Sequence, residues 1–304
     1  MGLELDWRCI RNASPTNGAM KIKLAITSVV VALLWFGAGT IDASPISLGN
    51  ASGFAALSLS GNVTLNGTVT GPVGVAAPGF SFSAPGTGFT SALYVNTGST
   101  IVSSGTASSV NQNAATNSYL SQAITDANNA AAQASASTPT SIFTSPPAGN
   151  TITQSAVGNY VYNLTGFNFG SGTLTVNAPA GSTVIVNIAT ISSNSQVTLN
   201  IGGGLTANDV IWNIQSPTFL NQGGGKNVTG ILLAPTSTVT VNGGATMTGQ
   251  VIAQAITETG SGVIIGTGLA PIVIVPEPAS LSIVAIGAAA LLGHRFFRRR
   301  KSPG

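Results

Sequence analysis

The sequence has little charge and few reactive side chains. Of its 304 residues only ten are Lys or Arg and seven are Asp or Glu, together 6%, whereas an ordinary soluble domain carries about a quarter charged residues. So little charge excludes the usual highly charged disordered chain and a coiled coil, which needs charged flanks. The remaining composition, with 43% hydrophobic residues and 38 glycines but only 6% aromatics, suits regular β-structure with tight turns.

The few charges are concentrated at the two ends of the chain. Between Pro45 and Val275 there are one Lys and three acidic residues, hence a net charge of −2. These four residues are Asp126, Asp209, Lys226 and Glu258. The net charge of +3 of the whole chain therefore comes from its ends, and the central part lacks the basic surface that binds phosphate backbones. We predict no nucleic-acid partner.

Cysteine and histidine are nearly absent. Cys9 and His294 are the only ones, and both lie in the end segments. The central part therefore cannot form a disulfide framework, a zinc site or a nucleophile–imidazole pair. Its three carboxylates are widely separated in the sequence, and general acid–base catalysis needs positioned titratable groups. We predict that the protein is not an enzyme and holds neither a metal nor a cofactor.

An export signal is predicted at the N-terminus. Lys21 and Lys23 precede an apolar run over residues 24–36, which small residues follow. A basic start, an apolar stretch of this length and a small residue before the cut define a secretory signal peptide. We expect cleavage after Ala43, so that residues 1–43 form an N-terminal extension and signal peptide, with Met1 or Met20 as the start. The alternative is an uncleaved membrane anchor, although the run is short for a span of about 20 residues.

The C-terminal segment combines three features in a fixed order. Pro276, Glu277 and Pro278 form a rigid extended hinge, because proline prevents a helix from continuing. The apolar stretch that follows predicts a transmembrane helix over about residues 279–297. A basic cluster then keeps the end of the span on the cytoplasmic side. It comprises Arg295, Arg298, Arg299, Arg300 and Lys301. The body is therefore predicted on the far side of the inner membrane, in agreement with the export signal.

This three-part tail, over residues 275–301, resembles the PEP-CTERM sorting signal of Gram-negative bacteria. The resemblance implies recognition by a membrane exosortase and processing near the Pro-Glu-Pro hinge. It also implies a membrane-anchored precursor that is delivered to the cell surface or to an extracellular polysaccharide matrix, with an anchor that is transient or retained. The alternative is a plain single-span anchor in which Pro-Glu-Pro occurs by chance.

Short β-rich runs recur through the body of the chain. Residues 174–177, 184–187, 197–200, 210–213 and 239–242 each end in Asn, and the first four of these Asn residues are 10, 13 and 13 positions apart. A strand and turn repeated in this way predict a β-solenoid over residues 44–270, with Asn at its corners. A β-sandwich is the alternative, because the period is imperfect.

A different pattern occupies residues 111–137, where Ala-rich apolar positions recur at steps of three and four. This spacing predicts a helix with one thin apolar face. Such a helix is not stable alone, so we expect it to lie along the β-structure. The predicted fold class is mainly β: a β-solenoid (β-helix) with one flanking Ala-rich α-helix, an N-terminal signal peptide and a C-terminal transmembrane helix.

Four segments of the body resemble the choice-of-anchor A family in their order and spacing, namely residues 176–187, 210–213, 230–235 and 249–253. That family consists of exported bacterial proteins with interchangeable C-terminal anchors, PEP-CTERM among them. The opening of the body, residues 48–57, is similar to the ice-binding β-solenoid family, in which a helix also lies along the solenoid. These resemblances imply an adhesin-like body and supply no catalytic residue.

Threonines recur with one residue between them, and alternate residues of a strand share a face. The candidate ligand face comprises Thr236, Thr238, Thr240, Thr246 and Thr248, and similar pairs occur at Thr68/Thr70, Thr151/Thr153 and Thr173/Thr175. We predict an exported structural or adhesin-like protein of the cell surface or extracellular matrix. The alternative function is binding of ice or of a glycan, such as an exopolysaccharide, through these Thr-rich faces. Thr is also simply a good outward residue of a strand.

Overall fold

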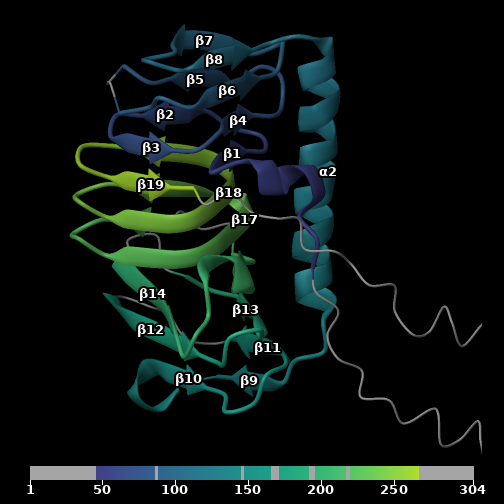
Figure 1. Ribbon diagram of the computed structural model, residues 1–304, viewed down its shortest axis with the longest axis vertical. Coiled ribbons are helices and arrows are strands. Elements are labelled where there is room, and N and C mark those ends of the chain that lie inside the picture. Colours follow the sequence, from purple (N-terminus) through teal and green to yellow (C-terminus); the bar gives the residue numbers. More distant parts are fainter. Residues whose placement is uncertain are drawn as a thin grey trace, which may run out of the picture. The chain divides into compact units, whose positions relative to one another are not determined.

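A stack of short strands with one long helix beside it makes up the described part of the chain (Figure 1). The computed structural model describes residues 46–85, 88–144, 147–165, 171–191, 196–216 and 220–266. The strands are β1 Ala56–Ser58, β2 Val63–Leu65, β3 Thr68–Thr70, β4 Val73–Val75, β5 Ser81–Ser83, β6 Ala92–Val95, β7 Thr100–Ser103, β8 Ser109–Asn111, β9 Ser141–Phe143, β10 Thr151–Thr153, β11 Asn159–Leu164, β12 Ser171–Asn177, β13 Thr183–Ile188, β14 Gln196–Gly202, β15 Val210–Ile214, β16 Leu220–Gln222, β17 Asn227–Val241, β18 Thr246–Glu258 and β19 Val263–Ile265. The helices are α2 Ala114–Ala136 and the short 3₁₀ turns η2 Gly49–Gly53, η3 Ala148–Asn150 and η4 Ala207–Asp209.

The coils of the stack form three faces. The helix face contains β9, β11, β13, β15, the first half of β17, the middle of β18, β1, β4, β6 and β8. The threonine face contains β10, β12, β14, the starts of β17 and β18, β19 and β3. The third face contains β16, the ends of β17 and β18, β2, β5 and β7. Every strand pair in the described part is parallel, which confirms the predicted β-solenoid over the antiparallel sandwich.

The chain does not wind from one end of the stack to the other. It starts in the middle with β1, coils toward the end formed by β7 and β8, and crosses to the opposite end through α2 (Figure 1). The strands β9 to β17 then coil back to the middle. There β18 pairs with β1 and β2, and β19 pairs with β3. The first and last coils therefore meet at the centre of the stack, with Ala56 beside Val251.

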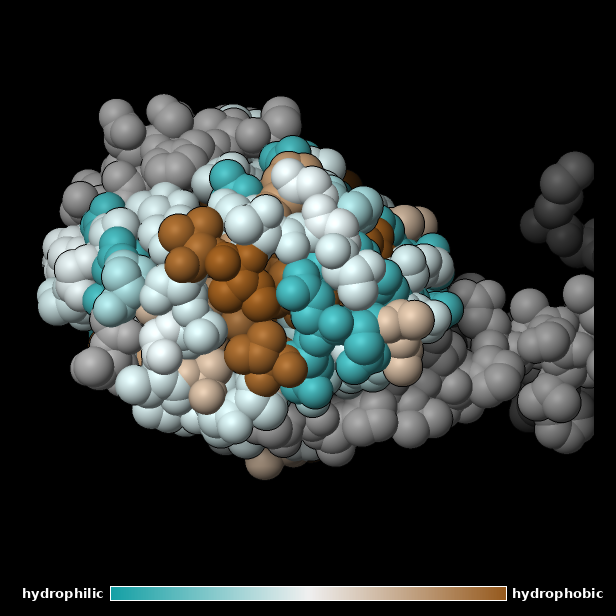
Figure 2. Space-filling view, turned by 90° about the horizontal axis from the view of Figure 1, so that it is seen from above, coloured by the Kyte–Doolittle hydropathy of each residue, from teal (hydrophilic) through white to brown (hydrophobic). Residues whose placement is uncertain are grey.

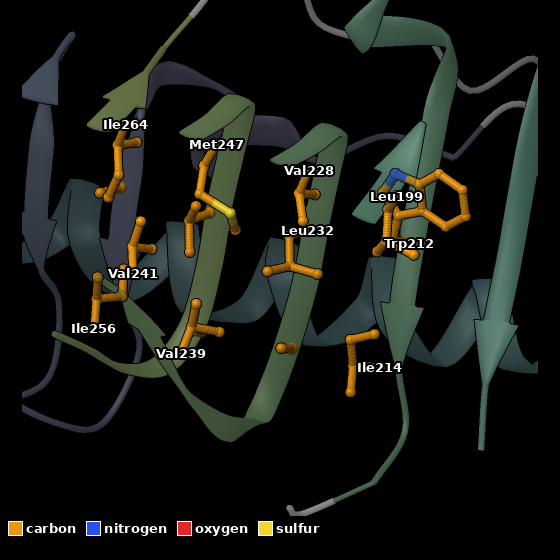
Figure 3. Close-up of a cluster of buried hydrophobic side chains, with 14 of the residues drawn as sticks. Leu199, Trp212, Ile214, Val228, Leu232, Val239, Val241, Met247, Ile256 and Ile264 are labelled. Atoms are coloured by element: carbon orange, nitrogen blue, oxygen red, sulfur yellow. The ribbon is translucent and has the colours of Figure 1, made fainter. Parts of the chain in front are cut away.

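Inward side chains stack in columns that run from coil to coil. One column behind the threonine face joins Leu199, Val228, Met247 and Ile264, whose side chains are all buried (Figure 3). Trp212 enters the same interior from the helix face and is also buried. Burying a large aliphatic side chain contributes about 1.5–3 kcal/mol, so these columns are the main stabilising contribution to the stack.

The predicted helix is confirmed as α2, which begins at Ala114 because Asn113 caps it. The side chain of Asn113 accepts a hydrogen bond from the backbone N–H of Thr116 at 2.9 Å, as N-cap residues do. The buried face of the helix is thin and consists of Leu120, Ala123, Ala127, Ala130 and Ala134. It packs with the outward aliphatic side chains of the helix face, including those of Ile185, Ile211 and Ile231. The small alanines allow the helix to lie close to the sheet.

An asparagine ladder fixes the second half of α2 to the helix face. The side-chain Nδ2 of Asn187 donates to the carbonyl oxygen of Ala134 at 2.8 Å and to Oδ1 of Asn163 at 2.8 Å. Asn213 in turn donates to Oδ1 of Asn187 at 2.8 Å. The prediction that the closing Asn residues occupy corners is wrong for Asn187, Asn200 and Asn213, which lie within β13, β14 and β15. The amides of Asn187 and Asn213 donate to helix carbonyls, and Asn200 lies on the threonine face.

Several sequence predictions fall outside the described residues. These are the signal peptide over residues 1–43 and the sorting tail over residues 275–301 with its transmembrane helix. Within the part of the chain that is described, no helix has the length and apolar character needed to cross a membrane.

Candidate binding surface

Two outward columns of the threonine face carry mostly Thr and Asn. The strand registers place the members of each column side by side on successive coils. The first column is Thr173, Thr198, Asn227, Thr246, Val263 and Thr68, and the second is Thr151, Thr175, Asn200, Thr229, Thr248, Ile265 and Thr70. All of these side chains are exposed or half-exposed.

The two columns form a regular grid. Neighbouring strands are about 4.7–4.9 Å apart, and alternate residues along one strand are about 6.6–6.8 Å apart. Each Thr presents one hydroxyl and one methyl group. Most strands of this face are hydrogen-bonded on both sides, so the grid is held by the backbone. The helix lies against another face, where it contacts β6, β13, β15 and β17.

Strand β19 interrupts the Thr columns with two apolar residues. Val263 and Ile265 take the places between the Thr pair of β18 and the Thr pair of β3. Ile265 is 38% exposed, although a large aliphatic side chain is usually buried. Val263 has nearly the same shape as Thr, whereas Ile265 is one carbon larger, so the row at β19 replaces hydroxyls by apolar surface.

The threonine face carries no charged side chain in its two columns. The charged residues of the described part have other positions. Asp126 Oδ2 accepts from the backbone N–H of Asn50 at 2.7 Å, which joins α2 to η2. Asp209 Oδ2 accepts from the N–H of Thr206 at 2.6 Å and closes the short turn η4. Lys226 lies in the turn before β17. The two columns therefore offer shape, hydroxyls, amides and methyls for binding, and no charge.

Known proteins are similar to this chain in sequence and in fold. The model of the ice-binding-like adhesive domain family matches residues 32–265, well over half of the chain. The chain belongs to this family. The match extends along the whole described solenoid, whereas the sequence resemblance to ice-binding proteins rested on residues 48–57. No curated protein matches the sequence.

Two solved structures have a fold similar to that of this chain. An ice-binding protein from an Arctic yeast is 19% identical, with a TM-score of 0.53 over 76% of this chain and 98% of that chain. An ice-binding protein from an Antarctic biological consortium is 21% identical, with a TM-score of 0.51 over 75% of this chain and 93% of that chain. Both support the solenoid fold. The choice-of-anchor A and PEP-CTERM resemblances stay predictions.

The five threonines singled out in the sequence do not share one face of this adhesive domain. Thr246 and Thr248 lie in the two columns of the threonine face, whereas Thr238 and Thr240 lie on the third face. Thr240 is only 8% exposed. Thr236 is exposed within the register shift between Ala234 and Thr238. The sequence pairs Thr68/Thr70 and Thr173/Thr175 do join Thr246/Thr248 on one face.

Several members of the grid were missed because they do not form a Thr-x-Thr pair. Thr198 is followed two places later by Asn200, and Asn227 by Thr229. Reading each β-rich run for Thr or Asn at alternate positions would have found them. Which runs lie side by side depends on the pairing of strands far apart in the sequence.

Among the residues that the structure describes, Glu258 is the one charged residue that points into the core. It lies in an inward column between Val241 and Leu65 and is 0% exposed. Its Oε2 accepts a hydrogen bond from the backbone N–H of Gly67, whereas Oε1 has no partner within the described residues. Burial raises the pKa of Glu258 above its usual range, and the hydrogen bonds from the backbone of Gly67 and Asn66 oppose this shift. Position 67 requires glycine, because a Cβ atom there would overlap the carboxylate.

In the described part of the chain no three His, Cys, Asp or Glu side chains come together as metal ligands would. The absence of enzyme activity stays a prediction. The arrangement of Glu258 bears on stability, since an unpaired buried carboxylate disfavours its own charged form.

Proposed function

We propose that this domain binds the surface of ice crystals through its threonine face. The observation that carries the proposal is the two-column grid, in which six of the seven strands present Thr or Asn and no position carries a charged residue. A repeating array of hydroxyls on a fixed backbone can match an ordered water lattice at many points at once. The family description and the named ice-binding relatives support this assignment.

The chemistry of the face suits a solid water surface. Methyl groups release hydrating water favourably when they are covered, and the hydroxyls of Thr can exchange hydrogen bonds with lattice water. Because the backbone of the stacked strands is already ordered, little conformational entropy is lost on binding. A charged side chain would hold its own hydration shell against the lattice.

Ice is favoured over a polysaccharide as the ligand of this face. The two columns contain no aromatic side chain, whereas amphipathic aromatic rings are typical of faces that bind organic ligands. An array without aromatic side chains offers a sugar ring few specific contacts.

We propose further that the domain works outside the cytoplasm as an ice adhesin. The support is the sequence of residues 275–301, with its Pro-Glu-Pro hinge, apolar stretch and basic cluster, together with the adhesive character named for the family. An exosortase would process the tail, and the inner membrane would hold the precursor. Fractionation with and without the sorting enzyme, with the mature C-terminus measured by mass spectrometry, tests this proposal. An intact basic cluster on the surface-located protein would contradict processing.

Bulky substitutions on neighbouring strands test the ice-binding face. The double variant Thr229→Tyr/Thr248→Tyr places two large rings on adjacent strands of the threonine face. The matched control, Thr257→Tyr/Thr64→Tyr, places the same rings on adjacent strands of the third face. Inhibition of ice recrystallisation is measured for both, with circular dichroism to confirm folding.

We expect the variant of the threonine face to need at least a tenfold higher concentration for the same inhibition. The control should match the unmodified protein. Equal inhibition by both folded variants would show that the threonine face does not bind ice.

A further inference from the structure

The exposed apolar side chains of the described part are concentrated at the two ends of the stack. Six large apolar residues are exposed, and four of them lie at the ends. Val102 and Val110 are 68% and 47% exposed at the upper end, which is formed by β7 and β8. Ile142 and Val157 are 60% and 64% exposed at the lower end, which is formed by β9, β10 and the turn 154–158. Figure 2 shows apolar side chains gathered at the upper end beside polar ones.

The strands at both ends have a free edge. Within the described residues β7 pairs only with β5 and β8 only with β6, while β9 pairs only with β11 and β10 only with β12. An unpaired edge is a template for another strand, and proteins usually protect it with charged residues. Residues 88–125 and 127–165, which include both ends, contain no Lys, Arg, Asp or Glu.

Polar side chains cover part of the upper end (Figure 2). The side-chain Nε2 of Gln112 donates to the carbonyl oxygens of Asn96 at 3.0 Å and Ser99 at 2.9 Å. This side chain leaves β7 and β8 uncovered. A solenoid normally needs a terminal cap with a polar outer face to stay soluble, whereas Val102 and Val110 expose apolar surface at this end.

The register of the strands on the helix face indicates which partner would cover the two ends of the stack. One inward column runs through every coil of that face, from Ser141 at the lower end to Val110 at the upper end. It consists of Ser141, Tyr162, Val186, Trp212, Leu232, Val251, Ala56, Val73, Leu93 and Val110. The ladder is parallel throughout, so a copy moved along the stack axis presents β9 to β8 with the same chain direction.

We propose that copies of this chain stack head to tail, with the lower end of one copy on the upper end of the next. The partner is a second copy because only its β9 continues both the parallel ladder and the inward column that ends at Val110. Upper-to-upper contact would reverse the chain direction at the junction. The contact is heterologous and repeats, so it extends into a row of domains.

Cysteine cross-linking in the full-length chain tests the direction of stacking. Neighbours in one column of stacked strands lie about 4.7–4.9 Å apart, within the Cα range of about 4.4–6.8 Å that a disulfide spans. Cys9→Ser removes the native thiol, and Val110→Cys or Ser141→Cys then supplies a single thiol at one end. The protein is kept in a mild nonionic detergent, because its end segments are apolar, and is oxidised before a non-reducing gel.

Each arrangement gives its own cross-linking pattern. For head-to-tail stacking, a mixture of the two single variants should form a disulfide-linked dimer at least tenfold more than either variant alone. The double variant should form a ladder of oligomers. If Val110→Cys alone formed dimers in the same yield as the mixture, the contact would be upper-to-upper and the proposal would be overturned. The absence of cross-links in the mixture would also overturn it.

A charge at the upper end gives a second, independent test. Val110→Lys should weaken self-association at least tenfold in sedimentation velocity, whereas Thr64→Lys on the third face should leave it unchanged. Equal association of both folded variants would overturn the proposal. Neither substitution lies on the threonine face, so ice-binding measurements stay interpretable whatever the outcome.

Discussion

The buried carboxylate of Glu258 predicts how the stability of the solenoid depends on pH. Glu258 stands among aliphatic neighbours at the junction of β18 and β2, with the N–H of Gly67 on Oε2 and no partner on Oε1. Glu258→Gln keeps the size and the acceptor of the side chain. It removes the negative charge and replaces Oε1 by an amide group that can donate.

The burial of Glu258 determines how the free energy of unfolding changes with pH. Because burial raises the pKa of Glu258 in the folded protein, the neutral carboxyl contributes stability that is fully present below the unfolded pKa of about 4.3. That contribution is lost as the pH rises through the raised folded value. We therefore expect the stability of Glu258→Gln relative to the unmodified chain to increase from pH 4 to pH 8, by about 1.4 kcal/mol for each unit by which the folded pKa exceeds the unfolded one.

Urea unfolding at several pH values measures this difference. The transition is followed by circular dichroism between about pH 4 and pH 8, and the free energy of unfolding is extrapolated to water. Since the other carboxylates are present in both proteins, their contributions cancel in the difference. If the difference in the free energy of unfolding between Glu258→Gln and the unmodified chain is the same at pH 4 and pH 8, the account of Glu258 as an uncompensated buried charge is refuted. The same holds if the variant is less stable by an equal amount at both pH values.

Three further changes test the core, the helix contact and the threonine face. Met247→Ala should destabilise the protein by about 2–5 kcal/mol because it opens a cavity in a buried column, whereas Thr248→Ala next to it should change stability in urea by less than about 0.5 kcal/mol. Asn187→Ala should cost about 1–3 kcal/mol in the same assay, since it removes the bonds to Ala134 and Asn163; no loss would mean that the ladder does not hold α2. Val263→Thr/Ile265→Thr completes both columns with hydroxyls and should lower the concentration needed to inhibit ice recrystallisation by a few-fold. A weaker inhibition by this double variant would indicate that the apolar row itself contacts the ice.

Local patterns in the sequence were sufficient for the elements and the fold class. Alternation of apolar residues predicts the strands, and the spacing of Ala127, Ala130 and Ala134 predicts a helix lying along them, as the structure shows. The Asn residues were misplaced because the preference of Asn for turns is local. In β13 and β15 the carbonyl groups of α2 offered Asn187 and Asn213 better partners.

The grouping of the threonines depended on contacts that the sequence pattern does not contain. Thr68 and Thr246 are far apart in the chain, yet Val263 alone separates them on the face. Their proximity results from the closure of the last strands on the first. A local pattern of alternate Thr residues indicates that they share a face within one strand, but not which strands are neighbours.

The pairing of the first coil with the last coil also determines when folding of the solenoid can be completed. A growing chain carries β1 to β3 from an early stage, but their partners β18 and β19 are made almost two hundred residues later, as the pairing of Ala56 with Val251 shows. Contacts this distant in sequence form slowly, because a long loop must close before they contribute. The strands β1 to β3 therefore lack half of their neighbours until the last described strands have been made.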